Sequence, residues 1–166
     1  GVCLRRAFYR LTLASCSSRL TVGFGAFFAH RDAHVEEDIY IGPFAVIGRV
    51  RLRKGSLVGT RASLLSGSTQ HDWDEAGRLT PSTMETLHQI EIGPHTWIGE
   101  AAVVMATVGE GALVSAGAVV SAPVPPGIVV AGNPARFVRR VKAGEGRADV
   151  AEFKERGHEP LVHAGH

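Results

Sequence analysis

The sequence predicts an all-β solenoid built from short repeats, and three features of the chain lead to this prediction. Aliphatic residues recur mostly at six-residue steps, glycine often follows directly, and a small residue often lies four places after the aliphatic. A period of six fits neither an α-helix at 3.6 nor a plain strand at 2. The aliphatic positions are Val35, Ile41, Ile47, Leu52, Val58, Leu64, Ile92, Ile98, Val104, Val108, Val114 and Val120.

The composition is that of one ordinary globular domain. The chain has 166 residues, of which 45% are hydrophobic and 20% charged, so it can bury a substantial core. A net charge of +2 gives no reason to expect a nucleic-acid partner. Two cysteines without a CxxC pair indicate free thiols, and no apolar run is long enough to span a bilayer. We therefore expect a cytoplasmic protein.

The first segment, residues 1–34, is expected to hold a helix and an entry strand. Within residues 3–14, Leu4, Phe8 and Leu11 follow helical spacing, and arginines lie between them. This helix could close the open end of the solenoid core or lie on a membrane surface as a basic amphipathic helix. With only three apolar anchors, we favour the closing role.

The solenoid itself is expected over residues 35–141. A single repeat cannot bury its own apolar face, so the repeats must stack into coils. Gly55, Gly111 and Gly117 each precede a small residue, where a turn favours positive φ. The spacing is short by one residue in 47–52 and by two in 104–108.

Two segments break the period. Residues 66–89 are polar and rich in titratable groups, which predicts a loop extruded from one corner of the solenoid. After Pro123, Pro125 and Pro126 the regular coils should end, with a last strand at 128–130 and a turn at 132–134. A short helix is expected over 137–142, followed by a solvated tail over 142–166 whose histidines are surface residues.

The segment WIGEAAVVMATVGEGALVSAGAVVSAPVPPGIVVAGNPARFVRRV resembles the hexapeptide-repeat acyltransferases, specifically the galactoside, maltose, nodulation-factor and colanic-acid O-acetyltransferases. The resemblance covers about residues 35–141 and is most specific at VVAGNPAR. It implies a left-handed parallel β-helix, a homotrimer, and acetyl-CoA held in clefts between neighbouring subunits. The acceptor-binding N-terminal region of the sugar acetyltransferases is not recognisable in this chain.

Transfer of an acetyl group from a thioester to a hydroxyl needs a base, and imidazole suits this role near neutral pH. His71 lies in the extruded loop where the resemblance places the catalytic histidine, and Asp72 or Asp74 could orient its ring. His88, where the loop rejoins the solenoid, is interpreted as structural, and His95 as a solvent-facing turn residue.

The resemblance also implies a site for the acyl donor. Ala116, Gly117 and Ser121 would line the pantetheine arm of coenzyme A. Arg136 and Arg139 would face the 3′-phosphate, since a guanidinium can bind two phosphate oxygens. Trp97 would lie near the thioester and acceptor, or pack at the subunit interface.

The leading hypothesis is an acetyl-CoA-dependent O-acetyltransferase acting on a hydroxyl of a sugar or polysaccharide precursor. The transfer would be direct, without a covalent enzyme intermediate and without a metal. The acceptor could be a lipid-linked saccharide, with peripheral membrane association.

Two alternatives remain. The first is a zinc enzyme resembling the γ-carbonic anhydrases, with His71, His88 and His95 as potential ligands. The second is a non-catalytic β-helix scaffold subunit. The pair His30 and His34 is weak evidence for a metal site, because residues four apart do not converge on a strand or loop.

Overall fold

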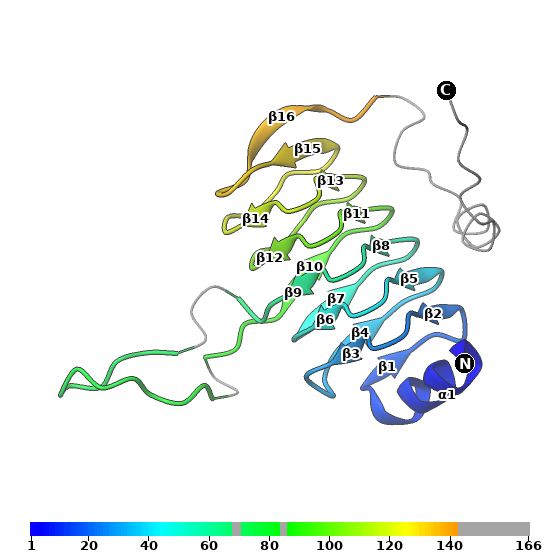
Figure 1. The fold of residues 1–166 in the computed structure, drawn as a ribbon, viewed down its shortest axis with the longest axis horizontal. Coiled ribbons are helices and arrows are strands. Elements are labelled where there is room, and N and C mark those ends of the chain that lie inside the picture. The colour runs from blue at the N-terminus through cyan, green and yellow to red at the C-terminus, as the bar shows by residue number, and fades with distance from the viewer. Residues whose placement is uncertain (68–70, 84–85, 143–166) are drawn as a thin grey trace, which may run out of the picture.

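The computed structural model describes residues 1–67, 71–83 and 86–142 and shows a β-solenoid with one short helix at its N-terminal end (Figure 1). The elements in these residues are α1 (Val2–Thr12), β1 (Ser15–Cys16), β2 (Leu20–Val22), β3 (Phe27–Phe28), β4 (His34–Val35), β5 (Ile39–Ile41), β6 (Val46–Ile47), β7 (Val50–Leu52), β8 (Leu57–Val58), β9 (Ser63–Leu64), β10 (Ile90–Ile92), β11 (Trp97–Ile98), β12 (Val103–Val104), β13 (Leu113–Val114), β14 (Val119–Val120), β15 (Ile128–Ala131) and β16 (Arg136–Arg140).

Successive strands turn from one side of a triangle to the next, so three parallel sheets form the walls. Sheet A has the order β1-β4-β7-β10, and sheet C has the order β14-β12-β9-β6-β3. Sheet B has the order β16-β15-β13-β11-β8-β5-β2 and therefore passes through six stacked turns before its last strand, β16. Parallel pairing already joins β1 to β4, β2 to β5 and β3 to β6, so the first turn is built from residues before Val35.

The predicted aliphatic positions form the interior of the solenoid. Each pairs in register with the equivalent residue one coil away, as Ile98 does with Val58 and with Val114. All twelve predicted positions are almost completely buried, with relative exposures of 0–2%. Small residues fill the corners, among them Ala62, Ala102 and Ala118, which are fully buried. The repeat prediction is confirmed.

All steps of the repeat that differ from six residues lie at one corner of the triangle, between sheet C and sheet A. Passing from sheet C to sheet A takes five residues from Ile47 to Leu52 and four from Val104 to Val108. The four-residue step recurs from Val120 to Val124, which pairs with Val108. The extruded loop occupies this same corner, between β9 and β10. The short steps are thus a property of one edge of the solenoid, while the other two edges keep a six-residue step.

The C-terminal element differs from the prediction. Residues 136–140 form β16, which pairs antiparallel with β15, so the helix expected over 137–142 is wrong. The turn at 132–135 reverses the chain, and β15 would otherwise leave an unpaired strand edge at this end of the solenoid. Residues 143–166, with His163 and His166, lie outside the described part of the chain.

The N-terminal helix lies at the opposite end, but it faces the solenoid with residues other than those expected. At the ends of the strands the backbone N–H groups donate to carbonyls of the following coil, as Gly23 does to Ile41 and Phe27 does to Ala45, although some corner N–H groups donate to the preceding coil. The carbonyls of Val22 and Ala26 are the first-coil equivalents of these two acceptors. Carbonyls of the first coil consequently have no preceding coil to bind them. Arg5 Nε donates to Val22 O at 2.9 Å, and Tyr9 Oη donates to Ala26 O at 3.3 Å.

α1 therefore closes the end of the solenoid through two side-chain hydrogen-bond donors, Arg5 and Tyr9, and through the packing of one aromatic ring. Tyr9 is buried and packs edge-on against Phe28, with ring centroids 4.8 Å apart. Burial raises the pKa of the Tyr9 hydroxyl, which keeps it protonated as a donor. Leu4, Phe8 and Leu11 are exposed, so α1 closes the end of the solenoid without burying the three apolar residues that suggested the helix. Leucine and phenylalanine cannot donate to the open carbonyls, whereas arginine and tyrosine can.

Candidate active site

The extruded loop is an arm that projects away from the wall of the solenoid (Figure 1). Its outer part is a hairpin, with an antiparallel bridge between Trp73 and Leu79. The tip is closed by Asp74, whose Oδ1 accepts the N–H groups of Ala76 and Arg78 at 2.9 Å each. These contacts, chiefly the Arg78 N–H, lower the pKa of the Asp74 carboxyl. Asp74 therefore shapes the turn and does not contact the His71 ring.

The root of the arm is tied to the C-to-A corner. Arg49 makes an ion pair through Nε with Asp32, and its Nη1 donates to Leu87 O. Its backbone N–H donates to the hydroxyl of Ser66 at 2.9 Å. His88 N donates to Ser66 O at 3.0 Å, which joins the two ends of the arm. The Arg49 guanidinium thus holds the returning segment of the arm, at Leu87, against the preceding coil.

His71 lies exposed on the hairpin, opposite Thr80. Its Nδ1 is 3.1 Å from Thr80 O, and a carbonyl oxygen can only accept. This contact assigns the ring proton to Nδ1 and leaves the Nε2 lone pair free to accept a proton. The carboxylate of Asp72 is directed elsewhere, because its Oδ1 accepts the Trp73 N–H at 2.8 Å.

Sequence reasoning missed Thr80 as the ring's partner. It considered the neighbouring carboxylates Asp72 and Asp74, although neighbours along a strand point to opposite faces. Backbone pairing fixes the register of the hairpin, since Thr80 N donates to Asp72 O at 2.8 Å. Asp74 and Arg78 flank a turn that contains Gly77. A glycine within a short polar turn is a hairpin signal, so this signal was available in the sequence.

The predicted donor-site residues lie along the solenoid wall at its C-terminal end. Ala116 and Gly117 are exposed at the corner between β13 and β14, and Ser121 directly follows β14. Arg136 and Arg139 lie on β16, and Arg136 is exposed. The five residues thus lie in the last coils of the solenoid, from the corner before β14 to β16.

The arm is separate from that wall within one protomer. The hydrogen bonds that the structure gives residues 71–80 all stay within the arm. In Figure 1 the arm leaves between β9 and β10 and points away from β14 and β16. Within one chain, the arm therefore lies apart from the end of the solenoid that carries β14 and β16 (Figure 1).

The outward rows of the three sheets differ in polarity. The row of sheet A holds Ser15, His34, Arg51 and Glu91. The row of sheet B holds Thr21, Tyr40, Leu57, Trp97, Leu113 and Val129, and the row of sheet C holds Phe27, Val46, Ser63, Val103 and Val119. Trp97 belongs to the sheet B row and is 43% exposed. The rows of sheets B and C are thus mainly apolar, with one threonine or serine each, and the row of sheet A is polar.

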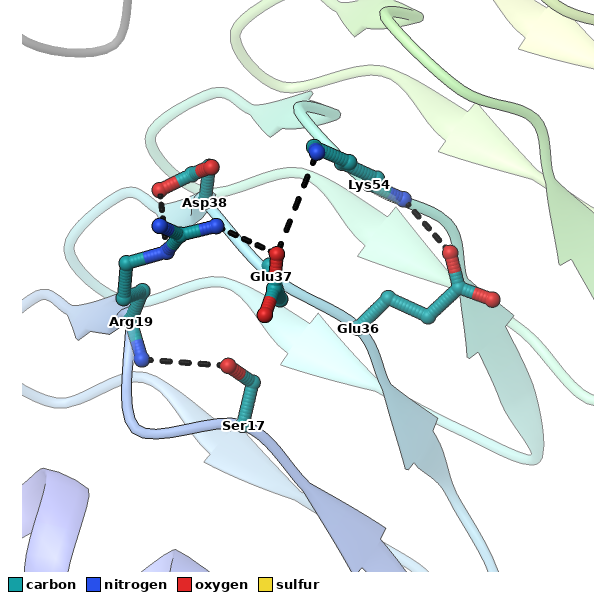
Figure 2. Close-up of polar contacts among 6 residues, drawn as sticks. All are labelled: Ser17, Arg19, Glu36, Glu37, Asp38 and Lys54. Carbon is teal, nitrogen blue, oxygen red and sulfur yellow. Dashed lines mark hydrogen bonds and ion pairs between the residues drawn. The ribbon is translucent and has the colours of Figure 1, made fainter.

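The corner from sheet A to sheet B is occupied by ion pairs that join successive coils (Figure 2). Arg19 from the first coil contacts Glu37 and Asp38, with Nε 3.1 Å from Asp38 Oδ1. The backbone N–H of Lys54 donates to Glu36 at 2.9 Å, and its Nζ is 3.9 Å from Glu37. These opposite charges contact one another, so the corner is held by ion pairs between successive coils.

The remaining histidines are dispersed. His88 is exposed where the arm returns to the solenoid. His95 lies at the corner between β10 of sheet A and β11 of sheet B, with φ of +53°. His34 belongs to the outer row of sheet A. Within the described residues, no three His, Cys, Asp or Glu side chains are grouped closely enough to hold a metal ion. Nor is any helix in that part of the chain long and apolar enough to cross a membrane.

Comparison with known sequences gives short but significant similarities to acetyltransferases, while no protein-family model matches the chain. A candidate acetyltransferase of Staphylococcus aureus, SACOL2570, is 41% identical over 59 residues, covering 34% of this chain and 30% of that protein. A candidate lipopolysaccharide biosynthesis O-acetyltransferase of Escherichia coli K12, WbbJ, is 27% identical over 125 residues, covering 71% of this chain and 62% of that protein. The matched regions span less than two thirds of either relative.

Solved structures share the fold over most of the chain. A maltose O-acetyltransferase from Clostridium difficile 630 aligns with a TM-score of 0.71 and 19% identity, covering 83% of this chain and 75% of that chain. A galactoside acetyltransferase in complex with coenzyme A aligns with a TM-score of 0.69 and 22% identity, covering 84% and 71%. An N-acyltransferase from Bacillus cereus, AntD, aligns at 0.59 with 12% identity, covering 92% and 94%. The chain has the hexapeptide-repeat β-helix fold of these enzymes, and that fold accommodates both O- and N-acylation.

Proposed function

We propose that this hexapeptide-repeat β-helix protein is an acetyl-CoA-dependent O-acetyltransferase that acts on a hydroxyl of a sugar or polysaccharide precursor. The observation that carries the proposal is the His71 ring, held by Thr80 O with Nε2 free on an arm directed away from its own coils. The local sequence similarity to acetyltransferases supports the activity. The name of the Escherichia coli relative supports oxygen as the attacking atom and a saccharide as the acceptor.

In the proposed reaction, Nε2 of His71 accepts the proton of the acceptor hydroxyl while the oxygen attacks the thioester carbonyl. The C–O bond forms, the C–S bond breaks, and the imidazolium returns the proton to the departing thiolate. The products are an acetyl ester and coenzyme A, and His71 regains its starting state. Nδ1 keeps its proton throughout because Thr80 O binds it.

Coenzyme A would lie along the C-terminal part of the solenoid wall. The corner at Ala116 and Gly117 is exposed, so backbone groups there are accessible to the pantetheine amides. The guanidinium groups of Arg136 and Arg139 on β16 would bind the 3′-phosphate. Trp97, in the outer row of sheet B, would border the thioester end.

The proposed assembly is a homotrimer whose active sites are shared between subunits. The apolar outer rows of sheets B and C would be buried against neighbouring copies, leaving the polar row of sheet A to solvent. The arm would then reach the wall of an adjacent copy, which supplies the residues that its own protomer holds too far away. The compartment that fits two free cysteines and a coenzyme A substrate is the cytoplasm.

The test of His71 is release of coenzyme A thiol from acetyl-CoA, measured with a panel of sugar and lipid-linked saccharide acceptors. We expect His71→Ala to lower kcat by roughly 10² to 10⁴. His88→Gln is the matched control, since it removes another exposed imidazole from the same arm, and it should retain activity. Full turnover by His71→Ala, or an acyl group trapped on a side chain, would contradict the mechanism.

Sharing of the site is tested separately by mixing two inactive variants. His71→Ala removes the base, and Ala116→Trp blocks the pantetheine position at an exposed corner where the larger side chain has room. If His71 serves a neighbouring wall, random 1:1 mixing restores about one quarter (half times half) of wild-type activity. If both parts act within one chain, every site keeps a defect and no activity returns.

A further inference from the structure

The outer face of α1 is apolar and is left exposed by the residues that the structure describes. Leu4, Ala7, Phe8 and Leu11 follow the i, i+3, i+4, i+7 spacing that places side chains on one side of a helix. Leu4 is 74% exposed, Phe8 58% and Leu11 87%. The opposite side of the helix, with Arg5 and Tyr9, is bound to the first coil. The orientation of the helix is therefore fixed, with its apolar face outward.

The charges around this face are all positive. Residues 1–31 contain five arginines and no aspartate or glutamate, whereas the rest of the chain has 13 basic residues (18 less 5) against 16 acidic ones. Arg6 and Arg10 lie on α1, and Arg31 Nε donates to Thr12 O at the end of the helix. Among the described residues, no carboxylate lies within 4.0 Å of Arg6, Arg10 or Arg31.

We propose that α1 docks the protein on an anionic lipid surface, with Leu4, Phe8 and Leu11 inserted among the acyl chains and Arg6, Arg10 and Arg31 at the headgroups. An apolar face bordered by arginines is the arrangement of helices that lie in the membrane interface. Charge complementarity favours anionic lipid over a protein partner without net charge, because each arginine near such a surface contributes about a fivefold gain in binding. The end of the solenoid that bears α1 would face the bilayer.

Docking is tested by sedimentation of the full chain with vesicles of phosphatidylcholine alone or with 30% phosphatidylglycerol added. The triple variant Leu4→Gln, Phe8→Gln, Leu11→Gln should bind the anionic vesicles at least about a hundredfold more weakly, since three apolar side chains leave the lipid. Arg6→Gln with Arg10→Gln should weaken binding by about 25-fold and reduce its salt dependence. Phe137→Gln with Val138→Gln removes two exposed apolar side chains from β16 and should not change binding.

Folding and self-association are measured on the same proteins. The triple variant should keep the far-UV circular dichroism and unfolding midpoint of the parent, because its three side chains lie on the exposed face of α1. Equal binding by the triple variant and the parent would overturn the proposal, as would equal binding to neutral and anionic vesicles. A smaller oligomer in light scattering of the triple variant, without binding of the parent to anionic vesicles, would identify a second copy as the occupant.

Discussion

Replacement of Gly99 by alanine tests what sets the distance between coils. A Cβ at this position would lie 2.5 Å from Ala116 N and 2.7 Å from both Ser115 C and Val114 O. Ordinary contacts begin near 3.4 Å, so the next coil must move by about 0.9 Å (3.4 less 2.5). All three obstructing atoms belong to the backbone and cannot rotate away. The Gly99 N–H also donates to Val114 O at 2.7 Å, and that bond would be strained by the movement.

The matched control is Gly111→Ala. Gly111 has φ of +61°, but nothing lies within 4 Å of a Cβ placed there. Its replacement therefore costs only the left-handed backbone conformation, about 1–2 kcal/mol, which restriction of the unfolded chain partly offsets. Ala101 already adopts φ of +54° in this solenoid, so a corner can accept alanine. Overpacking against rigid backbone costs up to about 3 kcal/mol.

The two variants are compared by urea unfolding at one fixed protein concentration, because association changes the apparent stability. With a denaturant slope of about 2 kcal/mol/M, Gly99→Ala should lower the midpoint by about 1.5 M and Gly111→Ala by about 0.5 M. Gly99→Ala should also weaken coenzyme A binding, since the displaced residue Ala116 lies on the proposed donor wall. A midpoint loss for Gly99→Ala no larger than that for Gly111→Ala would refute the reasoning.

Two further predictions concern charged contacts. Arg49→Met should lower the free energy of unfolding by about 1–2 kcal/mol, because Asp32 and Leu87 O lose their donor; Asp32→Asn in that background should recover part of the loss in a double-mutant cycle. The guanidinium of Arg53, which hydrogen-bonds to Glu36 at 2.7 Å, lowers the pKa of that carboxyl below its ordinary 4.5. The contribution of Glu36 is therefore complete above about pH 5 and is lost as the pH falls through the lowered pKa. Between pH 5 and pH 3, Glu36→Gln should lose less stability than the parent, by about 0.2–1 kcal/mol, and parallel pH curves would contradict the assignment.

Sequence period alone was sufficient for the scaffold because the repeat has one physical cause. Each coil must place one aliphatic side chain per wall into a narrow interior, and residues such as Ile98 and Val114 meet only when the six-residue step is kept. The same reasoning located the arm, since residues 66–89 cannot satisfy that step. It also marked 47–52 and 104–108 as irregular, without showing that both belong to a single corner.

Position in space decided the roles that the period left open. Whether His71 is oriented by a carboxylate or by a carbonyl depends on hairpin register, and the register places Thr80 O beside Nδ1. Whether residues 136–140 form helix or strand depends on the free edge of β15, which no local preference reveals. Pairing across the chain overrides local propensity in both cases.

The N-terminal helix shows the division most clearly. Its amphipathic pattern is written in the sequence, because helical spacing alone puts Leu4, Phe8 and Leu11 on one face. Which face meets the solenoid was decided by the open carbonyls of the first coil, which require donors and so select Arg5 and Tyr9. The sequence determined that α1 has one apolar and one polar face. Only the tertiary structure decided that the apolar face is left outside, because the unpaired carbonyls at the end of the solenoid exist only once the coils are stacked.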